Sequence, residues 1–166
     1  MYFVTGRLTA EEKFPFDQFL KREMDGESDL AQVVSHVASL VAEGAKAVAI
    51  VTPAESGSTG CWVSRLRSRQ PIFILSRHLS TVKRLNLCWG VYPVLVPDWK
   101  DSDDISERAK RMPQELGTAS TGDRIIISGV PLSIRGTTNL IKVEVAELNQ
   151  TGDFPDKSSL NDNILI

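Results

Sequence analysis

Four apolar runs, separated by segments with helical periodicity, constrain the fold of this chain more than any other feature of its sequence. They predict buried strands at residues 46–51, 71–76, 91–96 and 123–128. Apolar runs without alternation are expected where helices cover both faces of a parallel sheet. Because strands and helices alternate through short connections, the sequence predicts a three-layer α/β/α sandwich with a mostly parallel sheet.

A fifth strand is predicted at residues 140–145, where the pattern changes. Apolar and polar residues alternate in LIKVEV, which is typical of a half-exposed edge strand. The loop of about ten residues before it leaves no room for a crossover helix. We therefore expect a five-stranded sheet with four parallel strands and one antiparallel strand at its edge.

The composition is that of one soluble domain with extensions. The chain has 166 residues, of which 42% are apolar, enough for one core. A net charge of −2, without long blocks of like charge, does not point to nucleic acid or an anionic membrane. No apolar run has the length of a membrane span, and we expect a cytoplasmic protein. Three parts are predicted: a lead-in arm at residues 1–27, an α/β domain at 28–146 and a tail at 147–166.

A helix precedes the first strand, with Ser28 as its N-cap and Gly44 at its end. Its apolar positions follow the 3.6-residue period and predict the buried face, namely Leu30, Val33, Val34, Val37, Leu40 and Val41. His36 falls off that stripe, and no second metal-ligating residue accompanies it. The sequence therefore predicts that His36 faces solvent.

The two cysteines, Cys61 and Cys88, fall on segments expected to be helical and lack the spacing of metal ligands. We interpret both as reduced packing residues.

The turn after the first strand is the candidate binding site. It carries Glu55, Ser56, Gly57, Ser58 and Thr59 immediately before a predicted helix. The start of a helix offers backbone N–H groups and a partial positive charge to an anion, hydroxyls add donors, and glycine permits close approach or a positive φ. The alternative is that Ser58 or Thr59 simply caps the helix.

Five separated motifs together resemble one family in their order and spacing. They are ESGST (residues 55–59), PIFILS (71–76) with SRHLSTVKRLNL around its end, WGVYPVLV (89–96), TGDRIIISGVPL (121–132) and GTTNLIKV (136–143). This pattern resembles the C-terminal α/β domain of pyruvate kinase and covers about residues 28–146. The family's five-stranded sheet, with one antiparallel strand, agrees with the topology expected from connection lengths.

The resemblance implies regulation rather than catalysis. In the family this domain holds a phosphorylated allosteric effector and contributes to the tetramer interface, while catalysis takes place in a separate barrel of about 250 residues. Only 27 residues precede the matched part here. We therefore expect no catalytic residue, no metal ligand and no cofactor in this chain, and a pyruvate kinase barrel as a possible partner.

The resemblance also implies an effector site. Its phosphate would lie on the turn after the first strand, and its other end would meet a tryptophan and the loop before the last strand. With Arg135 added as the nearest cation in the sequence that could offset Glu55, the expected site residues are Ser56, Gly57, Ser58, Thr59, Trp99, Arg135, Gly136 and Thr137.

Two departures leave the effector's identity open. Glu55 stands where animal enzymes regulated by fructose 1,6-bisphosphate have a lysine. The arginine expected after the tryptophan aligns with Ser106, although Arg108 is near. Bacterial enzymes of the family also carry glutamate at the first place, and their effectors are often sugar monophosphates or nucleotides.

Two other functions stay open at this point: a stand-alone structural or interaction module without the effector site, and a small enzyme using the same turn, for which no general base is visible. Self-association through helix faces is also expected, because Phe14, Phe16 and residues 164–166 have no obvious core. Alternatively, these residues fold back on their own domain.

Overall fold

The computed structural model describes residues 30–96, 99, 102–129 and 140–147. Along the chain the elements are α2 (Leu30–Gly44), β1 (Ala49–Pro53), α3 (Ser58–Arg65), β2 (Ile72–Ser76), α4 (Leu79–Leu85), β3 (Val91–Leu95), α5 (Ser102–Glu115), β4 (Arg124–Gly129) and β5 (Leu140–Val145). The predicted arm at 1–27 and all of the predicted tail except Glu147 lie outside the described residues.

The five strands form one sheet in the order β3-β2-β1-β4-β5. β1 lies parallel to both β2 and β4, β2 lies parallel to β3, and β5 lies antiparallel to β4 at the edge. The topology predicted from apolar runs and connection lengths is confirmed. β1 begins and ends later than expected, and its later end reflects Thr52 and Pro53, which continue the pairing with β2.

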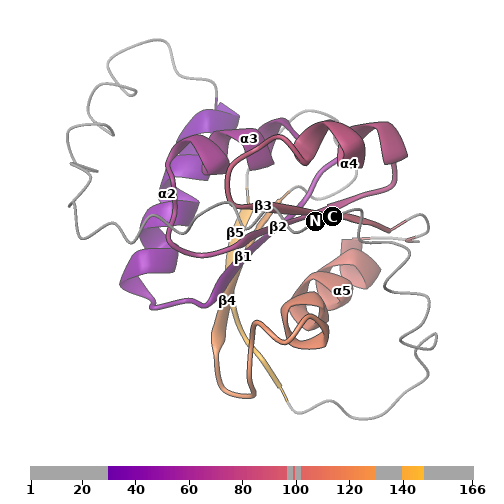
Figure 1. The fold of residues 1–166 in the computed structure, drawn as a ribbon. Helices are drawn as coiled ribbons and strands as arrows, with labels where there is room; N and C mark the ends of the chain where they lie inside the picture. The colour runs from indigo at the N-terminus through magenta and orange to yellow at the C-terminus, as the bar shows by residue number, and fades with distance from the viewer. Residues whose placement is uncertain (1–29, 97–98, 100–101, 130–139, 148–166) are drawn as a thin grey trace, which may run out of the picture.

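Helices cover both faces of the sheet, which confirms the three layers (Figure 1). One face packs against α2, α3 and α4 through strand residues such as Ile50, Ile74 and Ile126. The other packs against α5, with Val51 and Leu75 among its buried side chains. Successive strand residues point to opposite faces, and in the central strands both faces are buried, which explains the apolar runs.

The buried face of α2 differs from the predicted one. The helix turns a stripe of small residues inward, with Ala31, Ser35, Ala38 and Ala42 all buried. Of the apolar residues expected inside, Leu30, Val37 and Leu40 are exposed. Small side chains let the helix backbone approach the sheet and α3 closely, and the Ser35 hydroxyl donates to the Ala31 carbonyl at 2.6 Å, which removes most of the cost of burying it.

His36 is buried, with 4% of its surface exposed, so the prediction that it faces solvent is wrong. Once the small-residue stripe faces the sheet, His36 falls on the inward flank of α2. Ser39 is buried on the same flank.

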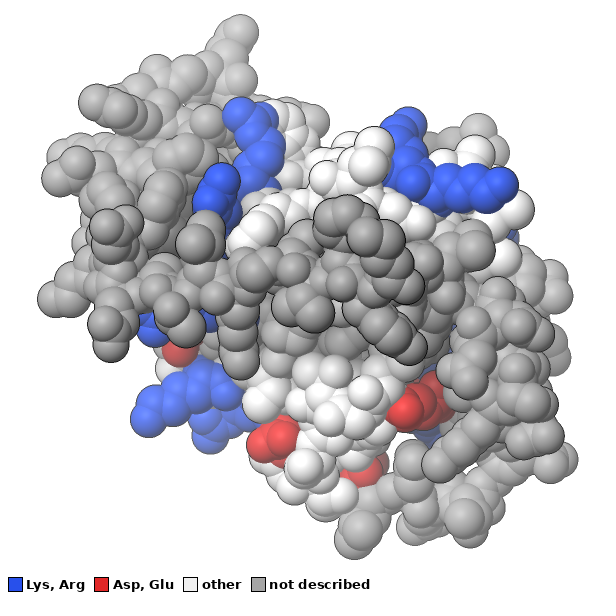
Figure 2. Space-filling model, in the orientation of Figure 1, with Lys and Arg blue, Asp and Glu red and all other residues white. Residues whose placement is uncertain are grey.

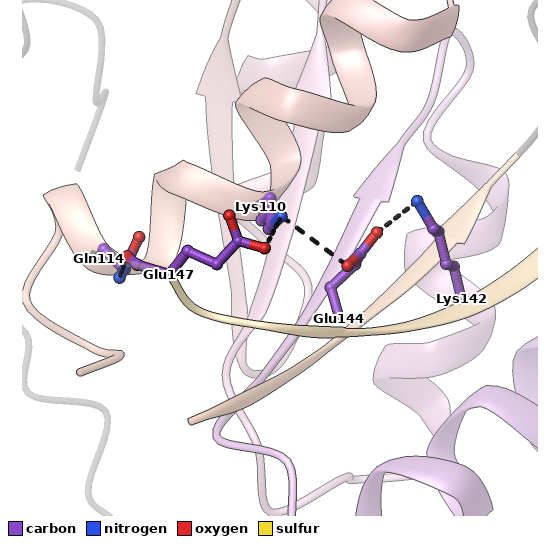
Figure 3. A network of polar contacts seen from close by, with 5 residues as sticks. All are labelled: Lys110, Gln114, Lys142, Glu144 and Glu147. Carbon is purple, nitrogen blue, oxygen red and sulfur yellow. Dashed lines mark hydrogen bonds and ion pairs between the residues drawn. The ribbon is translucent and has the colours of Figure 1, made fainter. Parts of the chain in front are cut away.

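Polar contacts fix α5 to the edge strand (Figure 3). Lys110 Nζ of α5 lies 3.0 Å from Glu147 Oε1 and 4.0 Å from Glu144 Oε2 of β5. Gln114 Nε2 donates to the Glu147 carbonyl at 2.9 Å, and Lys142 pairs with Glu144. Lys142 and Glu144 point to the side of the sheet that α5 covers, and Ile141 points to the opposite side. The alternation predicted for β5 thus gives the strand one polar face and one apolar face.

Candidate functional site

The candidate site lies at the edge of the sheet where parallel strands end. β2, the next strand along the chain after β1, lies on one side of β1, and β4 lies on its other side. The order in which successive strands are added to the sheet therefore reverses between β1 and β4. Ligands in open α/β sheets bind at the carboxyl ends of strands beside such a reversal. Gly129 pairs with Leu140, so both ends of the connection at 130–139 meet this edge.

Gly57 shapes the turn between β1 and α3. Its φ of 76° is left-handed, one of the two reasons for a glycine that the sequence left open, and it stands immediately before the first residue of the helix. Gly57 is therefore the N-cap residue, and the alternative that Ser58 or Thr59 caps α3 is wrong. The side chain that accepts from the helix start is that of Ser56, whose Oγ lies 3.4 Å from the Ser58 nitrogen.

The hydroxyls of the turn differ in exposure. Ser56 and Ser58 are exposed, with their Oγ atoms 3.0 Å apart. Thr59 is 6% exposed and lies on the inner side of α3. Ser56 and Ser58 are therefore the hydroxyls at hand for a ligand from solvent.

Two arginines from the neighbouring βα unit hold this turn. Arg77, which directly follows β2, forms an ion pair of 2.8 Å with Glu55. Arg84 of α4 donates to the carbonyl of Ser56, and Thr81 of the same helix donates to the carbonyl of Glu55 at 2.9 Å. Among the described residues Arg77 offsets Glu55, a role that the sequence assigned to Arg135, which lies outside them.

Arg77 also contacts Trp99, which represents the second of the segments expected in the site. Its guanidinium carbon lies 4.6 Å from the centre of the Trp99 ring, within range of a cation–π contact. Trp99 is buried, and no described residue accepts a hydrogen bond from its Nε1. One arginine thus joins the turn after β1 to the segment after β3, while Gly136 and Thr137 lie outside the described residues.

Sequence reasoning missed Arg77 and Arg84. Between residues 54 and 90 the chain has a single acidic residue, Glu55, and six basic ones, namely Arg65, Arg67, Arg69, Arg77, Lys83 and Arg84, although the whole chain has a net charge of −2. Figure 2 shows Lys and Arg side chains in separate groups, over α3 and α4 in the upper part of the view and again at its lower left, close to acidic side chains. A charge count by segment would have revealed this excess.

Other site chemistry finds less support within the described part of the chain. Arg108, two residues after the position where the resemblance implies an arginine, lies 3.1 Å from Asp104 one turn away on α5. No group of three or more His, Cys, Asp or Glu residues there could hold a metal ion. None of the described helices combines the length and apolarity needed to cross a membrane. The described arrangement offers N–H groups, hydroxyls and guanidinium groups, which suit an anion.

Comparisons with known proteins agree on one family. The family model described as the alpha/beta domain of pyruvate kinase matches residues 32–144. The pyruvate kinase of Thermotoga maritima is 35% identical over 135 residues, which are 81% of this chain and 28% of that protein. The pyruvate kinase of Clostridium acetobutylicum is 29% identical over 140 residues, 83% of this chain and 30% of that protein. The chain thus spans less than a third of the length of these relatives.

Proposed function

The chain belongs to the family of pyruvate kinase α/β domains, and on that basis we propose that it is a regulatory domain that binds a phosphorylated metabolite at the turn after β1. In this proposal it acts beside a pyruvate kinase catalytic barrel in the cytoplasm and performs no catalysis itself.

The observation that carries the proposal is the position of Arg77 between Glu55 and Trp99. It brings two of the three segments expected in the effector site to one place, at the carboxyl edge of the sheet. A phosphate on this turn would meet the Ser56 and Ser58 hydroxyls and the start of α3, with Arg77 and Arg84 beside it. Charge-assisted hydrogen bonds of this kind contribute about 1.5–3 kcal/mol each.

The first test separates a defined site from general attraction to positive charge. Arg84→Gln and Lys83→Gln remove the same charge from neighbouring exposed positions of α4, but of the two only Arg84 is seen to contact the turn. We expect Arg84→Gln to weaken binding of a sugar phosphate about tenfold or more by calorimetry, and Lys83→Gln to change it by less than about threefold. Equal losses would contradict a site at this turn.

One observation favours a second function. The Glu55 carboxylate already occupies Arg77, as it would in a structural module that has lost the effector site. If calorimetry with sugar phosphates and nucleotides detects no binding at millimolar concentration, this function replaces the first. Glu55→Gln provides a further check, since freeing Arg77 should strengthen phosphate binding if the site exists.

Self-association is the second part of the proposed role. Leu30, Val37 and Leu40 form an exposed apolar strip on α2. The edge strand adds exposed Val143 and Val145. Exposed apolar strips are commonly covered by a partner, and we assign the strip on α2 to a second copy of the chain.

Light scattering on point variants tests this assignment. Leu40→Glu places a charge within the strip and should shift the chain toward monomer. Lys83→Glu changes the charge at an exposed position of α4, outside the strip, and should leave association unchanged. A parent chain that stays monomeric at every accessible concentration would contradict the assignment.

A further inference from the structure

The two cysteines of the chain are neighbours in space. Cys61 lies in α3 and Cys88 follows α4, not within a helix as expected, yet their Sγ atoms are 3.2 Å apart. Both are free thiols, partly buried against the core between the sheet and the helices α2, α3 and α4. The partial burial of both thiols agrees with the interpretation of the two cysteines as packing residues. Packing alone, however, does not require the two sulfur atoms to be in contact.

The backbone around the two sulfurs is held on both sides. On the α3 side, a Cβ at Gly60 would overlap the Ile74 side chain, so α3 lies pressed against β2. On the other side, the Ser64 hydroxyl of α3 donates to the Trp89 carbonyl at 2.7 Å, next to Cys88. The S–S bond length is about 2.05 Å, so the sulfurs need to approach by roughly 1 Å more.

We propose that Cys61 and Cys88 are a redox modification site that closes to an intramolecular disulfide when the protein meets a peroxide. One thiolate attacks a peroxide oxygen, which gives a sulfenic acid and releases water or an alcohol. The second thiol sulfur then attacks the sulfenic sulfur and displaces its hydroxyl as water. The two thiols lose two electrons and two protons, and the peroxide takes up both.

The surroundings of Cys61 determine how readily this thiol ionises. Burial, with the hydrogen bond and the charge of Cys88 as smaller causes, raises the pKa of Cys61 to about 11 against the positive charge of Arg84 on α4. The thiolate fraction of Cys61 therefore grows about tenfold per pH unit below this pKa. Closure should be slow at pH 7 and much faster at pH 9.

The experiment uses the reduced chain, hydrogen peroxide, and alkylation of the remaining thiols before peptide mass spectrometry. We expect both thiols to disappear together, with a cross-linked pair of peptides containing residues 61 and 88, in a chain that stays a monomer on a denaturing gel. Dithiothreitol should restore both thiols. Thiols that survive at pH 9, sulfinic or sulfonic acids formed without the cross-link, or cross-links only between chains would overturn the proposal.

Two single variants provide the matched control. Cys61→Ser and Cys88→Ser each leave one thiol, and neither can form the internal bond, because the sequence has no other cysteine. Since the cross-link restricts the unfolded chain, the oxidised parent should melt at least about 5 °C above the reduced parent. The variants should show no rise after the same treatment. This outcome does not depend on effector binding, so either proposal can fail alone.

Discussion

At the scale of single residues, both backbone conformation and side-chain packing require a glycine at position 57. Its left-handed φ of 76° and the Leu85 side chain, 2.9 Å from a Cβ built there, both oppose any larger residue. Gly90 has a similar φ of 65°, but a Cβ there would meet nothing within 4 Å. Gly90→Ala thus isolates the cost of the backbone conformation, about 1–2 kcal/mol.

We predict that Gly57→Ala lowers the free energy of unfolding more than Gly90→Ala does, by roughly 1 kcal/mol for the added contact with Leu85. Urea denaturation of both variants measures the difference. Equal losses would mean that Leu85 moves aside without cost.

The residue scale also shows what the sequence could predict about the site. Gly57 was predictable because the preference for positive φ is local. The ion pair of Arg77 with Glu55 was not, because it depends on β2 lying next to β1 in register, with both strands ending at one edge. Arg135 was chosen instead from a sequence in which neither distance nor strand order is visible.

At the scale of elements, α2 shows why periodicity alone can choose the wrong face. Its sequence carries two stripes at helical spacing, one of large apolar residues and one of alanines and serines. Hydrophobicity favours the first, but close contact with the sheet and α3 requires the second. The serines are buried at little cost because their hydroxyls donate to carbonyls four residues earlier.

This packing predicts that a leucine is tolerated at one position of α2 and destabilising at the next. Ala38 is completely buried, so Ala38→Leu should lower the free energy of unfolding by about 1–3 kcal/mol through overpacking. Val37 is 41% exposed, and Val37→Leu should change it by less than about 0.5 kcal/mol. Chemical denaturation distinguishes them, and a tolerant Ala38 would contradict the close approach of α2.

The contact between α5 and the end of β5 predicts a pH dependence. The hydrogen bond to Glu147 is the main cause that raises the pKa of Lys110 above its ordinary value. The charged lysine therefore contributes its full stabilisation at neutral pH and loses it as pH rises through the raised pKa. Lys110→Met should cost about 0.5 kcal/mol at pH 7 and progressively less above about pH 10.5. Lys83→Met serves as an exposed control, and a cost that stays constant with pH would rule out the ion pair.

At the scale of the whole molecule, the strand order determines where ligand chemistry can gather. The strands and their parallel or antiparallel directions were predictable from apolar runs and connection lengths, but their order in the sheet was not. With all four parallel strands ending at one edge, Arg77 and Arg84 lie beside the turn after β1 at that edge, whereas Arg65, Arg67 and Arg69 stand at the end of α3 and before the start of β2. A chain that is weakly acidic overall thus presents a small positive face, made by Arg77 and Arg84, to an anion at this turn.

This positive face predicts how ligand binding responds to salt and to the phosphate group. Glucose 6-phosphate should raise the melting temperature at low salt, and glucose should not, because only the phosphate meets the positive face. The Debye length falls from about 30 Å at 0.01 M salt to about 3 Å at 1 M. The stabilisation by the phosphate should therefore shrink in 1 M salt without vanishing, because hydrogen bonds from the turn remain. Complete loss would indicate diffuse attraction without a site, and an equal effect of glucose would place the binding outside the positive face.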